Sequence, residues 1–495
     1  MNPFPLQPAW PRTPLEVNDL FARQRDGDPL GVAVHRFMAL YACFAAGLST
    51  SIVEWSALPL LICFLVRMTG QHRILRPLWF DSVGLLTVAW AALLTLSMLY
   101  SAASGRDVLT DWQSIRYAGF VIALWPVLDI RDWLIRALIA GLLVGQGAQL
   151  LQFLQMTFDF RLLPIDRMPG RISGWWEPVV AGSLLCGALG LHLGAALFPP
   201  PRGRGQGVGS LVPVTQASRD SVARHSFIAR VTAFFGVLIT LAGILATGTR
   251  GAWIGATLLL VFAFLLIMVR VAQASRLCMG DASPQRTSIM RGLLRPLALI
   301  LLLTTLSLGA VALFAGQSLR DRYHRGVHEV RAALTEQNYA TDTGLRIAMW
   351  KWAIAASRTH PLLGVGSGGY QPYVRSQTPE SAAALGAPAQ AIPLVHRHAH
   401  SWYLHTLAVT GLLGFATLFL LFVRAVVSGL RPPASPDGVL PNPHNFGPAL
   451  ALIGLACAGL FDPITVNAQT SYLFWILIAL CLPSRPRDIA NGAGA

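Results

Sequence analysis

The sequence has little charge and almost no lysine. Only 12% of its 495 residues are charged and 54% are hydrophobic, and Lys351 is the only lysine. Soluble proteins carry roughly 25% charged residues, so this composition excludes a string of soluble domains and indicates one membrane domain. The net charge of +15 comes from arginines that interrupt hydrophobic runs. Nucleic-acid-binding proteins gather their cations on a polar surface instead, so we expect no nucleic-acid partner.

Cysteine motifs and a cleavable leader are also missing. None of the six cysteines belongs to a Cys-x-x-Cys pair, so neither a disulfide framework nor a zinc site is predicted. The polar, proline-rich N-terminus lacks the short hydrophobic core of a signal peptide, and we expect none to be removed.

Long apolar runs are what the chain does contain. A membrane-spanning helix needs about 20 mostly apolar residues, and the sequence therefore predicts an all-α polytopic membrane protein with about 12 transmembrane helices. The predicted spans are 36–52, 55–67, 82–103, 116–129, 133–156, 178–198, 231–247, 252–269, 296–316, 401–423, 447–463 and 466–482. Between the first two, Glu54, Trp55 and Pro59 predict a bend.

Arginines in short loops predict the orientation, because cytoplasmic loops carry the excess of positive charge. Alternate loops are arginine-rich when both chain ends are placed inside. The chain then divides into residues 1–316, with nine spans and an N-terminal tail, a periplasmic segment at 317–400, and three last spans at 401–495. The cytoplasmic loops 199–230 and 270–295 are rich in Gly, Pro, Ser and Arg and are predicted to be flexible.

The segment 317–400 is predicted to have its own secondary structure. Residues 318–337 and 344–358 resemble amphipathic helices, the second with an apolar stripe of Ile347, Trp350 and Ile354. A glycine-rich turn follows at 364–369, and the remainder to about residue 395 is predicted to be a mobile, lid-like loop.

Six of the twelve histidines lie in this segment, three of them in the run His396-Arg397-His398-Ala399-His400-Ser401. The run allows three interpretations: the histidines share a metal ion, they lie in a solvated loop, or His400 is a general base supported by polar neighbours such as His398 and Ser401. We favour the third, because imidazole is the side chain best suited to proton transfer near neutral pH.

Arginines form the second group of candidates. Arg250 lies in a short turn between two apolar helices, where it must pair, reach the interface or face a polar cavity. It could instead anchor a lipid phosphate, and Arg346 could form a surface salt bridge with Asp342 or Glu336. Further candidates for substrate binding on the same predicted side are Arg116, Arg171, Arg320 and Arg322. Arginines with few carboxylates suit a phosphate-bearing substrate, and neither a metal ion nor another cofactor is required.

Three motifs in this order resemble the O-antigen ligase and polymerase superfamily. Residues 249–255, Thr-Arg-Gly-Ala-Trp-Ile-Gly, are similar to its Ser/Thr-Arg-Gly-Ala-x-x-Gly element. The stretch from 344 to 366 contains Gly-Leu-Arg and later His-Pro-Leu-Leu-Gly-Val-Gly, like the family's arginine helix and Pro-Leu-x-Gly-x-Gly element. His400-Ser401, nine residues and then Gly411 resemble its His-(Asn/Ser)-x9-Gly element. Arg171 with Gly174 resembles a weaker one.

The resemblance, strongest to the O-antigen ligases, implies a C-type membrane glycosyltransferase architecture in the bacterial inner membrane, with the site facing the periplasm. It implies transfer of a glycan from undecaprenyl pyrophosphate to the lipid A–core of lipopolysaccharide, without metal or cofactor. Arg250 and Arg346 would bind the pyrophosphate, and His400 would act at the acceptor hydroxyl. The expected partners are thus the lipid-linked donor, the lipid A–core acceptor and membrane lipids.

Alternatives remain open for the acceptor. The histidine-rich run resembles the related protein O-oligosaccharyltransferases, and a polymerase would use the same chemistry on a growing glycan. His398 could exchange roles with His400. A secondary transporter or flippase is the alternative of a different class, but it should show internal repeats and polar, broken helices near the bilayer midplane.

Overall fold

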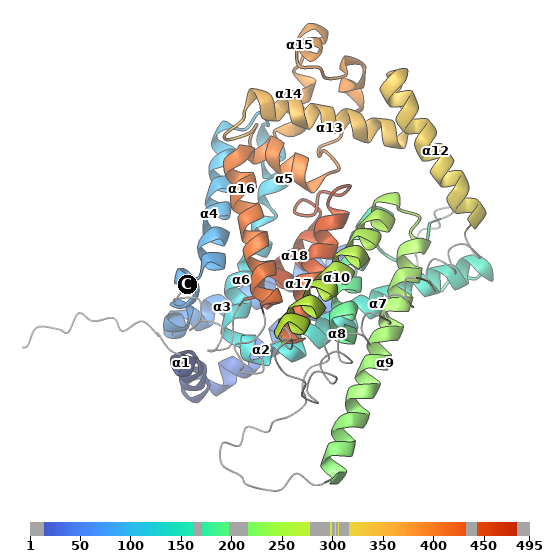
Figure 1. Ribbon diagram of the computed structural model, residues 1–495. Coiled ribbons are helices and arrows are strands. Elements are labelled where there is room, and N and C mark those ends of the chain that lie inside the picture. Colours follow the sequence, from blue (N-terminus) through green and yellow to red (C-terminus); the bar gives the residue numbers. More distant parts are fainter. Residues whose placement is uncertain are drawn as a thin grey trace, which may run out of the picture.

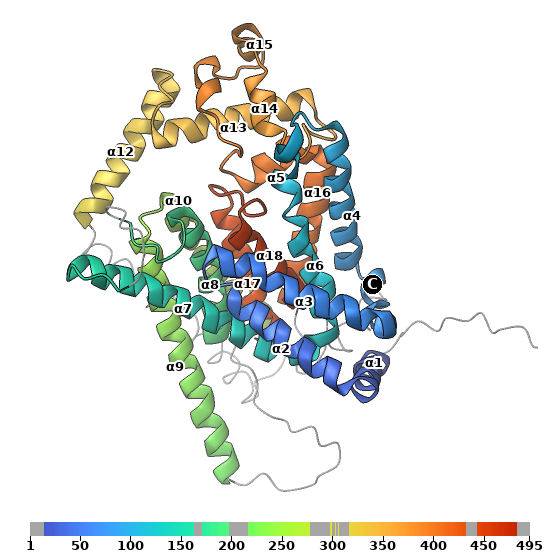
Figure 2. The same cartoon turned by 180° about the vertical axis from the view of Figure 1, so that it is seen from behind.

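The computed structural model describes residues 14–162, 171–197, 216–277, 316–431 and 443–482, together with residues 298, 302 and 305. Every regular element within these ranges is a helix, and no strand occurs in them. Figures 1 and 2 show the arrangement from opposite sides. The prediction of an all-α polytopic membrane protein is confirmed.

Eleven helices correspond to predicted spans. They are α2 (Pro29–Ala45), α3 (Thr50–Gln71), α4 (Ser82–Leu96), α6 (Ile115–Leu124), α7 (Arg131–Thr157), α8 (Pro178–Leu197), α9 (Gln216–Ala246), α10 (Arg250–Leu277), α16 (Trp402–Leu430), α17 (Pro443–Ala458) and α18 (Ala468–Leu480). Six segments of the described chain are long and apolar enough to cross a membrane, and four shorter helices are apolar as well. The span predicted at 296–316 lies almost entirely outside the described residues.

Two helix boundaries differ from the prediction. The break between the first two spans lies at residues 46–49, not at Glu54, and Pro59 lies inside α3. The break falls there because Gly47 contacts α7 so closely that a Cβ atom would lie 2.1 Å from the backbone of Gly141. The helix α9 begins at Gln216, so the second half of the loop predicted as flexible is helical. Seven of the fifteen residues from 216 to 230 are Ala, Arg or Gln, which favour a helix, and none is Gly or Pro.

The centre of the membrane domain is α8. Nearly all of its residues are buried, and it packs against α17, α9 and α10. A helix that is apolar on every side is stable only when neighbours cover it all round. The helix α18 is buried in the same way from Gln469 to Leu480. These two helices form the core around which the more exposed spans are arranged.

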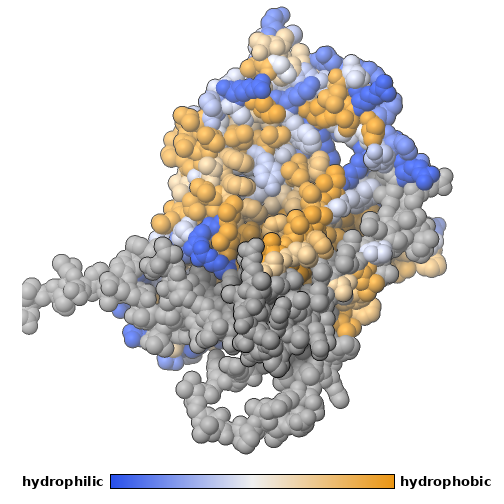
Figure 3. Space-filling model, viewed as in Figure 1, coloured by the Kyte–Doolittle hydropathy of each residue, from blue (hydrophilic) through white to orange (hydrophobic). Residues whose placement is uncertain are grey.

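A helical cap covers one end of the molecule. It consists of α12 (Gly316–Thr335), α13 (Asp342–Thr359), α14 (Tyr370–Arg375), α15 (Pro379–Ala384) and the 3-10 helix η6 (Ala389–Leu394). Figure 3 shows hydrophilic residues gathered over this end and hydrophobic residues on the flank below it. The two helices predicted at 318–337 and 344–358 are present as α12 and α13.

Two expectations about the cap are wrong. The predicted apolar stripe of α13 is not its most buried side, since Ile354 is 39% exposed while Ala348, Met349 and Trp352 are buried. Small alanines allow this other face to pack closely, which a count of large apolar residues misses. The predicted mobile loop contains α14, α15 and η6, and the indole N–H of Trp352 donates to Pro388 O at 3.2 Å. The loop is therefore folded against α13.

The helix α16 is broken at Gly411, and the cap enters the break. Gly411 has φ 61° and ψ −167°, a conformation essentially restricted to glycine. The carbonyls of Ala408 and Val409 accept hydrogen bonds from the N–H groups of residues 365 and 366, and Leu412 N–H donates to Pro361 O at 2.8 Å. The segment 361–366 thus satisfies backbone groups that the break leaves free. The glycines of two motifs have a structural explanation, since they permit this close contact.

The connections predicted to lie outside gather at the capped end. They include α5 (Leu109–Trp112), the segment 171–177, the turn before α10 and the loop between α17 and α18. Backbone bonds connect them, from Ile172 N–H to Ala246 O at 2.9 Å and from Trp402 N–H to Gly459 O at 2.8 Å. The helix α1 (Pro14–Gly27) lies at the opposite end (Figure 1).

Candidate active site

The histidine run lies immediately before α16, beneath the cap. His396 is exposed, whereas His398 and His400 are half-buried. The rings of His398 and His400 lie 4.4 Å apart between centroids. The Nδ1 atoms of both rings are buried without a hydrogen-bond partner in the described part of the chain. Buried polar atoms are usually paired, so these two nitrogens are candidates for a ligand contact.

His400 has an unusual backbone. Its φ is +46°, in the left-handed region that costs a non-glycine residue about 1–3 kcal/mol and occurs preferentially at functional sites. Burial lowers the pKa of its imidazole to about 2, with contributions from His398 and Arg346. Burial likewise lowers the pKa of His398 to about 4. Both rings are therefore neutral at physiological pH, as an acceptor of a proton must be.

The metal interpretation of this run is not supported by its geometry. Within the described ranges, no group of three or more His, Cys, Asp or Glu residues is placed so that it could hold a metal ion. The solvated-loop interpretation fits only His396, because the other two rings are largely covered.

Arg250 is the first residue of α10 and is held by the cap. Its Nη1 atom donates to Glu329 Oε2 at 2.9 Å and to Thr343 Oγ1 at 2.8 Å. Thr343 also donates to Glu329. Burial opposes ionisation of Glu329, but the hydrogen bonds from Arg250 and Thr343 hold its pKa below the usual value. The Arg250 guanidinium is thus paired within the protein. This pairing differs from the alternative in which it anchors a lipid phosphate.

Arg346 and Arg171 lie close to Arg250 but have no such partner. Each is half-buried, and neither makes a hydrogen bond or ion pair with the described residues. The salt bridge considered for Arg346 with Asp342 or Glu336 does not form. Burial lowers the pKa of Arg346, the carboxylates of Asp342 and Asp462 counteract this, and the charges of Arg171 and Arg250 add to it. Three cations concentrated in this way create a positive potential, which is favourable for an anion.

Asp462 faces this group and was not among the predicted residues. It is 2% exposed, and its carboxylate accepts from Ser183 Oγ at 2.6 Å and from Asn467 Nδ2 at 2.8 Å. Burial raises its pKa to about 6, against the opposing effects of Ser183 and Arg346. An acidic residue in a short turn between two apolar spans is the sequence signal that could have found it.

Asp111 and His405 form a buried pair that sequence reasoning also missed. His405 Nε2 lies 3.0 Å from Asp111 Oδ1, and both side chains are less than a tenth exposed. A histidine in a membrane span is a recognisable signal. Asp111 shows no such signal, because it is almost 300 residues from His405 in the chain.

Two of the predicted substrate-binding residues, Arg116 and Arg320, are not joined to this group. Arg116 donates to Glu54 Oε1 at 3.4 Å and to Tyr117 OH at 2.9 Å. Arg320 is exposed on α12, and the side chain of Arg322 lies outside the described residues. Ser401 does lie beside the histidines, where it is buried and its carbonyl accepts from His405 N–H at 2.9 Å.

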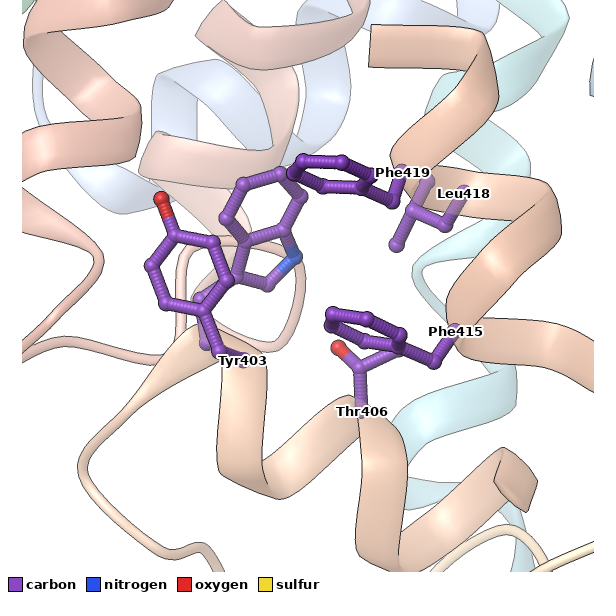
Figure 4. Close-up of a pocket in the computed structure, with 6 residues that line it drawn as sticks. Tyr403, Thr406, Phe415, Leu418 and Phe419 are labelled. Carbon is purple, nitrogen blue, oxygen red and sulfur yellow. The ribbon is translucent and has the colours of Figure 1, made fainter. Parts of the chain in front are cut away.

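A small aromatic pocket crosses the break in α16. It is lined by Trp402, Tyr403 and Thr406 before the break and by Phe415, Leu418 and Phe419 after it (Figure 4). The Tyr403 hydroxyl donates to Ala456 O at 2.8 Å. The residues that line the pocket include no carboxylate, imidazole or cation.

Comparison with known proteins identifies the central part of the chain. Residues 235–419 match the model of a family described as O-antigen ligase. This part of the chain is therefore similar to the O-antigen ligases. The matched region begins within α9, ends within α16 and includes Arg250, Arg346 and His400. Arg171 and Asp462 lie outside it, although the fold brings them to the same cluster.

One relative shares a longer stretch at low identity. A protein of Haemophilus influenzae described as uncharacterized is 22% identical over 293 residues. The aligned part covers 57% of this chain and 65% of that protein, just under two thirds of its length.

Proposed function

We propose that the protein transfers a glycan from undecaprenyl pyrophosphate to the lipid A–core of lipopolysaccharide, in the inner membrane and with the capped end in the periplasm. The observation that carries the proposal is the cluster of Arg171, Arg250 and Arg346 beside a neutral, half-buried His400. A pyrophosphate needs cations, and an acceptor hydroxyl needs a base. The superfamily match supports both assignments.

The arginines act on the leaving group. Arg171 and Arg346 make no hydrogen bond or ion pair with the described residues, so their N–H groups are available to phosphate oxygens, which arginine binds bidentately. Arg250 is already oriented by Glu329 and Thr343. As the glycosidic C–O bond breaks, its electron pair leaves with the pyrophosphate, and preorganised cations stabilise that charge without rearranging. No metal ion takes part in this scheme.

His400 acts on the acceptor. The acceptor oxygen forms the new bond to the anomeric carbon while its proton passes to the imidazole, and attack opposite the leaving group inverts the anomeric centre. Arg346 and the neighbouring histidines lower the pKa of the unoccupied site. The anionic donor offsets this positive field, so its binding raises the basicity of His400 when it is needed.

The acceptor is tested by lipopolysaccharide profiling of a deletion strain that is complemented with wild type or with His400→Ala. Loss of the high-molecular-weight ladder, an intact lipid A–core and accumulation of undecaprenyl-linked polymer support ligation. Failure of His400→Ala to complement would link the activity to this site.

Two other outcomes replace the proposal. A ladder reduced to core plus one repeat identifies a polymerase. An unchanged ladder, with a glycoprotein missing instead, identifies a protein O-oligosaccharyltransferase, which the run of three histidines resembles.

A further inference from the structure

The buried pair of Asp111 and His405 connects three separate parts of the capped end. Asp111 belongs to α5, and His405 to the first turn of α16. The second carboxylate oxygen of Asp111 accepts from Gly368 N–H, in the glycine-rich turn of the cap, at 2.7 Å. The carboxylate therefore joins α5, the cap and α16 at one point.

The hydrogen bonds define the orientation of the His405 ring. Its Nδ1 atom accepts from Ala399 N–H at 3.4 Å, and its Nε2 atom donates to Asp111 Oδ1 at 3.0 Å. The imidazole is thus fixed from both sides, in the way that a carboxylate usually orients a histidine.

Ala399 stands between His398 and His400. The amide held by His405 therefore belongs to the His398–Ala399 peptide, one residue before the left-handed His400. A strained conformation of this kind persists only when its surroundings hold it. The rings of His405 and His398 are 6.4 Å apart between centroids, which is too far for the direct proton transfer that a catalytic role would require.

We propose that His405 and Asp111 are positioning residues that hold the His398–Ala399 peptide, one residue before His400, and so keep the base aimed at the acceptor. The proposal rests on the function assigned to His400 above. It makes His405 essential for the rate of transfer through its two hydrogen bonds, and not through a proton of its own.

The test compares His405→Gln, His405→Ala and Asp111→Asn in the full-length, detergent-solubilised protein. Glutamine can accept from Ala399 and donate to Asp111, whereas alanine can do neither. We expect His405→Ala to lower kcat at least about tenfold, with the KM for the lipid-linked donor changed less than about twofold. His405→Gln should recover most of the loss and keep the pH profile of the wild type, and Asp111→Asn should be intermediate.

A second readout needs no activity. Modification of single histidines by diethyl pyrocarbonate, followed by mass spectrometry, reports how well His398 and His400 are held. We expect His405→Ala and Asp111→Asn to speed modification of both, while exposed His324 on α12 reacts at the wild-type rate in every variant. The near-isosteric Gln and Asn variants keep the test valid if His405→Ala does not fold.

Two results would overturn the proposal. One is wild-type kcat and unchanged modification rates in His405→Ala and Asp111→Asn. The other is a His405→Gln protein as inactive as His405→Ala with His400 still protected, which would make the imidazole itself a participant. If the wild-type protein transfers no lipid-linked glycan, the proposed function fails, and the modification rates still decide whether His405 holds the loop.

Discussion

The two ends of the molecule treat their charged side chains differently. At the α1 end, Arg67 donates to Asp28 at 2.9 Å and to His35 at 2.5 Å. His35 also contacts Ala123 O at 2.8 Å. Asp129 accepts from two arginines, Arg25 and Arg36, in the same region.

The capped end leaves comparable groups without protein partners. Arg171 and Arg346 make no hydrogen bond or ion pair with the described residues, two histidine nitrogens are buried unpaired, and His400 is strained. Burying an unpaired polar or charged group is costly. At the α1 end, Gln24, Arg36 and Arg67 also keep one buried polar atom each without a partner, but the two arginines there are ion-paired. The capped end differs in having whole guanidinium groups without a hydrogen-bonded partner, as expected where a ligand binds. Four predictions test this contrast.

The largest effect is expected for His400→Ala. Removal of a general base should lower the transfer rate by ~10²–10⁴-fold. Stability should not fall, because the ring has an unpaired nitrogen and the backbone strain is unchanged. Rates in membranes and thermal unfolding in detergent measure the two quantities. A variant that loses its fold together with its activity would assign His400 a structural role instead.

The second largest effect on the transfer rate is expected for Arg346→Ala. Loss of one preorganised cation at the leaving group typically costs ~10²–10³-fold in rate. Because Arg346 makes no hydrogen bond or ion pair with the described residues, its removal should change the unfolding temperature little, since the repulsion by Arg171 and Arg250 that is relieved is offset by the attraction of Asp342 and Asp462 that is lost. The measurement is the rate at saturating donor beside the unfolding temperature. A fall in that temperature without a loss of rate would contradict the assignment.

Arg67→Ala is the matched control at the opposite end. It leaves Asp28 and His35 without their shared partner, and breaking a buried ion pair costs about 3–5 kcal/mol. We expect poor accumulation in the membrane, but a normal transfer rate for each folded molecule. Activity normalised to folded protein from size-exclusion chromatography separates the two. A normal yield with reduced activity would remove the contrast between the ends.

The smallest effect concerns pH. The pKa values of His398 and His400 are lowered to about 4 and about 2 by burial. Below pH 6.5 the unfolded chain binds protons that the folded site does not, so stability is lost as pH falls. Each histidine contributes at most about 1.4 kcal/mol per pH unit. Unfolding of wild type and His400→Gln at pH 7.5 to 5 should show a shallower decline in the variant; equal slopes would argue against the lowered pKa.

The sequence predicted the helices better than their contacts. The apolar runs predicted the positions of eleven helices, because a run of about 20 apolar residues is typical of a membrane-spanning helix. Arg250, Arg346 and His400 could be selected because polar residues stand out beside such runs. That Arg171 lies near these residues could be expected only from the predicted topology, which places it on the same side of the membrane.

The partners of these residues could not be predicted in the same way. Glu329, Asp111 and Asp462 reach the site through long-range packing that leaves no local pattern. The buried alanine face of α13 was missed because a hydrophobic stripe is sought among large residues. Arg116 was a reasonable candidate by sequence, yet it forms an ion pair with Glu54 and does not join the arginine cluster.

The break at Gly411 divides α16 into two parts, and the cap is bonded to both. Ala408 and Val409 before the break and Leu412 and Leu413 after it are all hydrogen-bonded to the segment 361–366. The start of the helix is bonded to the membrane domain instead, since Trp402 N–H and the Tyr403 hydroxyl donate to Gly459 O and Ala456 O. The helix that follows the histidine run is therefore anchored to the cap and to the end of α17 at the same time.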